Sequence, residues 1–170
     1  MHLLAVALAT LAFGGSAPGE SNVAPCDKAM IGHGSADWRG ESVVAGPVGA
    51  RKHPLSSMSP TRNGFVTKMP LLVEGRAPET VTVSVPSSLR SRVFLYYGHI
   101  IGRDGQPTTA FAEARGYGET EFQLCDDKPR TVWPGGIRVK GDKPVHLLVS
   151  AEGRPAIPLR LGRPVAYEPR

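Results

Sequence analysis

The stretch that decides the fold is TVTVSV, residues 80–85, in which every second residue is valine. Successive side chains of a β-strand point to opposite faces, so this strict alternation predicts a strand with one buried face. Val81, Val83 and Val85 lie on the predicted core face. Pro86 ends the strand, because proline has no N–H to donate to a neighbouring strand.

Similar strand patterns recur on both sides of this segment at roughly ten-residue spacing. They cover residues 65–67 and 71–73, which form one interrupted strand, and residues 92–97, 121–124, 137–140, 145–149 and 158–161. The apolar run 92–97 predicts a central strand. Residues 137–140 and 145–149 flank a Gly-Asp turn, which predicts a hairpin. Prolines and arginines mark 158–161 as an edge strand.

The chain contains 20 glycines and 16 prolines, and no window after residue 17 shows sustained helical periodicity. About seven to nine short strands of this kind predict an all-β fold, an antiparallel two-sheet β-sandwich of immunoglobulin-like or jelly-roll-like type. Residues 46–63 are predicted to form a long loop. The expected core residues are Val83, Leu95, Phe122, Leu124, Val139, Leu147 and Val149.

Residues 3–13 form an apolar, uncharged run that is too short to span a bilayer and ends near Gly15-Ser16-Ala17. This pattern predicts a signal peptide over residues 1–17 and a single secreted domain over residues 18–170. The leader has no Lys or Arg before its apolar run, so a buried N-terminal strand or helix is the alternative. No other segment approaches membrane-spanning length, so the protein is predicted not to be transmembrane.

The chain has two cysteines, Cys26 and Cys125. In an exported protein such a pair predicts a disulfide, whereas two free thiols would fit a reducing compartment. The bond would close a loop of roughly 100 residues. No Cys-x-x-Cys or His-x-x-x-His spacing occurs, so we expect no metal site and no cofactor.

The formal net charge is +5, and the basic residues are interspersed with acids and glycines. The chain lacks the basic stripe with interleaved aromatic residues that is typical of nucleic-acid binding, so we expect no nucleic-acid partner. A basic surface could be attracted to an anionic cell-wall polymer, or it could serve solubility alone.

Two patterns are candidates for a catalytic site. His33 and Ser35 lie in a Gly-rich segment that lacks the Gly-x-Ser-x-Gly elbow of serine hydrolases. The carboxylates Glu119, Glu121, Asp126 and Asp127 surround Cys125, but a glycosidase needs two of them facing each other across a cleft. We therefore predict no catalytic residue.

Trp133 precedes Pro-Gly-Gly, which implies a tight turn or bulge where two backbones approach each other. Its ring could stack against a sugar or an aliphatic ligand, or it could plug one end of the sandwich. With Trp133, the candidates for a ligand-binding site are Tyr97 and Arg138.

Several motifs together resemble a family. They are Cys26 followed by Trp38, the block KMPLLVEG at residues 68–75, the strand VFLYY at 93–97, and Phe122 to Cys125 leading to Trp-Pro-Gly-Gly. The chain resembles uncharacterised small secreted proteins of high-GC actinobacteria. The resemblance implies an exported, disulfide-closed β domain and carries over no functional residue.

These observations predict an exported non-enzymatic domain, secreted or at the cell envelope, with a binding or structural role. The expected partner is a cell-wall polymer or another protein. A secreted hydrolase with an unrecognised site is the alternative. A third possibility is a structural or inhibitor-like protein that acts through the segment 46–63.

Overall fold

The computed structural model describes residues 20–31, 40, 42–75, 79–100, 114–126 and 129–166. The predicted signal peptide (1–17), the segment with His33 and Ser35, Trp38 and Asp127 lie outside the described residues. The described chain is almost entirely β, with two short 3-10 helices, η1 (Cys26–Lys28) and η2 (Ser87–Leu89). The predicted all-β class is confirmed.

One layer is a five-stranded sheet in the order β1-β10-β8-β13-β14. Its strands are β1 (Ser21–Ala24), β10 (Glu119–Gln123), β8 (Thr80–Ser84), β13 (Val145–Ala151) and β14 (Ile157–Gly162). All neighbouring pairs are antiparallel except β1, which lies parallel to β10. As predicted, the strand around residues 158–161 lies at an edge of its sheet.

The other layer consists of two sheets joined end to end. A five-stranded sheet has the order β2-β11-β7-β4-β3, and a four-stranded sheet has the order β5-β6-β12-β9. The first contains β2 (Met30–Ile31), β11 (Arg130–Trp133), β7 (Leu71–Glu74), β4 (Val48–Arg51) and β3 (Ser42–Ala45). The second contains β5 (Ser59–Thr61), β6 (Gly64–Lys68), β12 (Gly135–Val139) and β9 (Val93–Tyr97).

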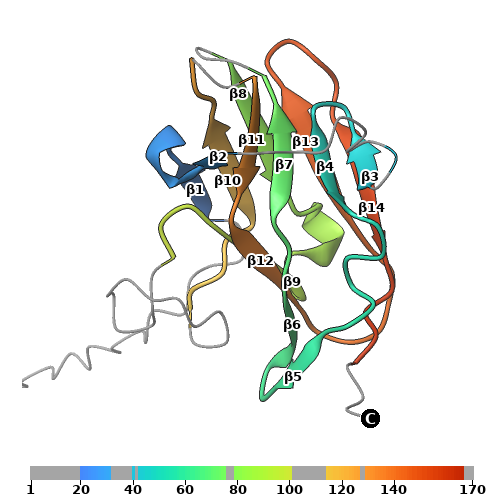
Figure 1. Cartoon of the computed structure of the whole chain (residues 1–170). Coiled ribbons are helices and arrows are strands. Elements are labelled where there is room, and N and C mark those ends of the chain that lie inside the picture. The colour runs from blue at the N-terminus through green and yellow to red at the C-terminus, as the bar shows by residue number, and fades with distance from the viewer. Residues whose placement is uncertain are drawn as a thin grey trace, which may run out of the picture.

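Prolines separate the two sheets of this layer. Pro134 lies between β11 and β12, and Met69 and Pro70 lie between β6 and β7. The chain therefore passes twice from one sheet into the other at the same level, which bends the layer. Figure 1 shows this layer, with β12 below β11 and β6 below β7.

A single hydrophobic core lies between the layers and draws side chains from all three sheets. All seven residues predicted for the core are buried, and so are Val81 and Val85. The sandwich-like arrangement is thus confirmed, although the described strands are more numerous than predicted because the second layer is divided.

Residues 137–140 and 145–149 do not form the predicted hairpin. β12 pairs with β6 and β9, whereas β13 pairs with β14 and β8. The turn at residues 141–144 instead carries the chain from one layer to the other. The guanidinium of Arg92 fixes this crossing by donating to the carbonyl oxygens of Lys140, Lys143 and Pro144 at 3.2, 3.0 and 2.7 Å.

Three further expectations need correction. β9 is the last strand of its sheet and not a central one. Its free edge is covered partly by a backbone bridge between Leu95 and Tyr117. Residues 65–67 and 71–73 belong to two strands in different sheets. The segment 46–63 is not a loop throughout, because it contains β4, β5 and the buried residues Leu55 and Met58.

The disulfide between Cys26 and Cys125 is present, with the two Cα atoms 5.4 Å apart. Cys26 opens η1, which links β1 in one layer to β2 in the other, and Cys125 follows β10. The bond therefore fastens the N-terminal segment where it crosses between the layers. In the part of the chain that the structure describes, no helix has the length and apolar character needed to cross a membrane.

Candidate binding site

Trp133 lies in the core. Its side chain is fully buried, and its indole N–H donates to the hydroxyl of Thr131 at 3.0 Å. That hydroxyl lies 3.5 Å from the carbonyl oxygen of Val73, to which it donates in turn. The ring of Phe122 packs edge-on against the indole, with 5.2 Å between centroids. Of the two roles predicted for Trp133, the structure shows the packing role. No face of the indole ring is open for stacking on a ligand.

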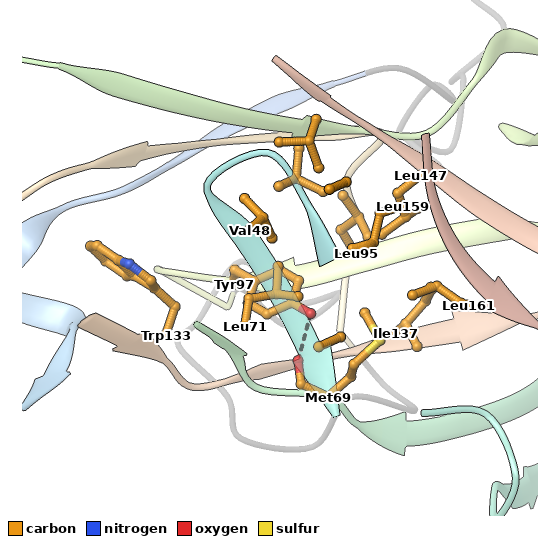
Figure 2. Packing of buried hydrophobic residues seen from close by; sticks show 14 of the residues in the cluster. Val48, Met69, Leu71, Leu95, Tyr97, Trp133, Ile137, Leu147, Leu159 and Leu161 are labelled. Carbon is orange, nitrogen blue, oxygen red and sulfur yellow. Dashed lines mark hydrogen bonds between the residues drawn. The ribbon is translucent and has the colours of Figure 1, made fainter. Parts of the chain in front are cut away.

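Tyr97 is also fully buried. Its ring packs edge-on against that of Phe122, the same ring that packs against Trp133. Its hydroxyl donates to the carbonyl oxygen of Met69 at 2.6 Å (Figure 2). This bond satisfies the backbone where β6 ends and β7 begins. Burial raises the pKa of the Tyr97 phenol far above its ordinary value, because the phenolate would have no water around it.

We expect alkaline pH to destabilise the fold through Tyr97. The unfolded phenol ionises at about pH 10, whereas the folded phenol stays protonated, so the free energy of unfolding falls as pH rises above that value. The loss attributable to this residue is about 1.4 kcal/mol per pH unit. Urea unfolding between about pH 9 and pH 11 should show a steeper loss in the wild type than in Tyr97→Phe. Equal slopes would contradict a buried phenol.

Arg138 is the third predicted candidate, and it differs from the other two. It lies on β12, where its neighbours Ile137 and Val139 enter the core, so its side chain projects from the opposite face of the sheet. Only 8 % of the residue is exposed. Its guanidinium carbon lies 4.7 Å from the ring centroid of Phe94 and 5.6 Å from that of Tyr96.

A basic groove lies where β4 ends and β6 passes into β7. The pairing of Ala50 with Leu71 brings residues 51–57 beside residues 67–70. The groove has a volume of about 560 Å³. Its lining residues are Arg51, Lys52, His53, Pro54, Ser56, Ser57, Thr67, Lys68, Met69 and Pro70.

The lining of this groove combines three permanent positive charges, an imidazole and three hydroxyl groups, and it includes no acidic residue. Such groups donate hydrogen bonds to oxyanions. The sequence showed the basic run 51–53 but not Lys68, which is brought to it by the sheet register alone.

The wall of the groove is held in place by the C-terminal segment. The amide of Met58 donates to the carbonyl oxygen of Val165 at 2.9 Å. The amide of Val165 donates to the carbonyl oxygen of Leu55 at 2.8 Å. His53 adopts a left-handed backbone conformation, and its carbonyl oxygen accepts from the amide of Ser56 at 3.1 Å. The groove is therefore preformed, which lowers the entropic cost of binding.

A second hollow, of about 600 Å³, lies at the other end of β4 and β7 and has the opposite charge. Glu74, Glu79 and Glu152 line it together with Arg154. Glu74 accepts from Nε of Arg130 at 3.1 Å. Within the described ranges, no group of three or more His, Cys, Asp or Glu residues is arranged to hold a metal ion.

Of the carboxylates considered as catalytic groups, the three that the structure describes do not face one another across a cleft. Glu119 and Glu121 alternate with the buried residues Thr120 and Phe122 on β10, so they project outward from the sheet, and Asp126 is exposed. None of the three lines either of the two hollows.

Comparisons with known proteins add no family to this description. No family model matches the chain, and no curated protein matches it. The resemblance to small secreted actinobacterial proteins therefore stays a prediction that rests on the quoted motifs.

Proposed function

We propose that this protein is a non-enzymatic exported domain that binds an anionic polymer of the cell envelope through the basic groove. The observation that carries this proposal is the composition of the groove: Arg51, Lys52, His53 and Lys68 line it without an acidic neighbour. A cluster of charges of one sign in a concave surface concentrates the electric field and attracts ligands of the opposite charge.

The shape and chemistry of the groove favour a polymer over a small substrate. The four basic residues come from two separate segments, so a chain with repeated phosphate or carboxylate groups could contact several of them at once. Hydroxyls of Ser56 and Ser57 also line the groove and can donate to sugar or phosphate oxygens, whereas that of Thr67 donates to the carbonyl oxygen of Lys68. The net charge of +5 adds long-range attraction that depends on salt.

Export is the second part of the proposal. The Cys26–Cys125 disulfide fits an oxidising compartment, since such bonds are rare in reducing cytosol. The predicted signal peptide at residues 1–17 supports the same location.

Co-sedimentation with purified cell walls tests the groove. The wild type is expected to sediment at low salt and to be released as NaCl is raised, because the contacts are ionic. Arg51→Ala combined with Lys52→Ala should weaken binding by roughly tenfold, since two charge-assisted contacts are lost.

The matched control is Lys143→Ala combined with Arg154→Ala. It removes the same charge from exposed residues that do not line the groove, so it should bind like the wild type. A wild type that stays in the supernatant at low salt would rule out the proposal. If both double variants lost binding equally, the binding would depend on the net charge of the protein and not on the groove.

A further inference from the structure

Arg138 is a buried cation on the face of the four-stranded sheet that points away from the core. The sheet register pairs it with Val66 on β6 and Phe94 on β9, so these three side chains form a row on one face. The next row consists of Lys68, Gly136 and Tyr96. Gly136, the middle residue of this row, has no side chain.

Aromatic rings contact the guanidinium but do not satisfy it. The ring of Phe94 also contacts a second cation. Nζ of Lys140 lies 5.3 Å from the centroid of the Phe94 ring. Ring faces attract both cations and offset part of their desolvation. They do not supply the oxygen acceptors that the in-plane N–H groups of a guanidinium require.

The acceptors are missing from the described structure. Nε and Nη1 of Arg138 are both buried, and neither has a hydrogen-bond partner among the residues that the structure describes. In the same part of the chain, no carboxylate forms a salt bridge with Arg138. A buried charge without a counter-ion is costly, and a native structure that keeps one calls for a specific reason.

We propose that Arg138 is the centre of an anion-binding site, in which a single carboxylate or phosphate group accepts hydrogen bonds from the guanidinium beside Phe94 and Tyr96. The planar, permanently charged guanidinium suits such oxyanions. Arg138 does not line the basic groove, although Lys68 of the groove lies in the next row, so this site adjoins the one proposed for the polymer and rests on a different observation.

Nuclear magnetic resonance of the wild-type protein tests the site directly. The probes are inorganic phosphate and sodium acetate, added in separate titrations to ¹⁵N-labelled protein. The Nε–H signal of Arg138 is expected to shift saturably with at least one probe, and the probe that binds more tightly identifies the oxyanion class. An Nε–H signal that moves with neither probe would overturn the proposal.

The groove variant serves as the control for specificity. In Arg51→Ala with Lys52→Ala, the Arg138 signal should respond as in the wild type. If its response is lost there, the probe binds in the groove and the Arg138 site is refuted.

Variants of Arg138 separate an anion site from a packing role. Ligand binding to the folded state raises the thermal midpoint, so the probe that shifts the Nε–H signal should stabilise the wild type. Arg138→Lys keeps the charge but loses the planar fork, and it should bind the probe at least tenfold more weakly. Lys143→Gln, which removes a charge from an exposed residue, should keep the full response. A midpoint in Arg138→Lys that rises as much as in the wild type would contradict the assignment.

Discussion

Removal of the disulfide, by Cys26→Ala combined with Cys125→Ala, is expected to lower the free energy of unfolding by about 4 kcal/mol. The two cysteines are 99 residues apart in sequence, and in the chain-entropy model a cross-link over such a loop restricts the unfolded chain strongly. The fold adds a local reason, because Cys26 lies where the chain leaves β1 and crosses to β2.

Urea unfolding measured by circular dichroism, with and without reductant, tests this expectation. The wild type should lose stability when reduced, whereas the double alanine variant should be insensitive to reductant and match the reduced wild type. Hydrogen exchange should also quicken first in β1, whose parallel pairing with β10 ends beside the bond. A double variant as stable as the oxidised wild type would show that the bond adds little.

The strands that could be predicted best are those whose alternation is local. The valines of β8 and the alternating residues Val145, Leu147 and Val149 of β13 each mark one face of a strand, and every one of them is buried. Partner choice is not local, however. The Gly-Asp turn after β12 looks like a hairpin turn, but β12 finds its partners in β6 and β9, which come earlier in the chain.

The candidate sites show the same limit. Lys68 reaches the basic groove only because β4 pairs with β7, and no local pattern states that register. Arg138 sits between apolar residues in β12, where an alternating charged residue is ordinarily read as solvent-facing. Its burial depends on Phe94 and Tyr96, which β9 brings to it from far along the chain.

Gly135→Ala is the second change with a large expected effect. Gly135 pairs with Tyr97 where β12 begins, and a Cβ atom there would lie 2.1 Å from Cδ1 of Tyr97 and 2.4 Å from the carbonyl oxygen of Tyr96. The ring of Tyr97 is held in the core by its bond to Met69, and the carbonyl belongs to the backbone, so neither can yield cheaply. We expect a loss of about 3 kcal/mol in the free energy of unfolding, at the upper end of the usual cost of overpacking.

Gly153→Ala is the matched control, measured by the same urea unfolding. Gly153 has a left-handed backbone with no atom within 4 Å of an added Cβ, so its substitution should cost about 1–2 kcal/mol from backbone strain alone. A smaller loss for Gly135→Ala than for Gly153→Ala would contradict the close approach of β12 to β9. Because that approach also positions Arg138 against Phe94, a folded Gly135→Ala protein should lose the anion response of Arg138. The Trp-Pro-Gly-Gly segment would then matter to binding through the strand β12 that it begins, and not through the indole of Trp133.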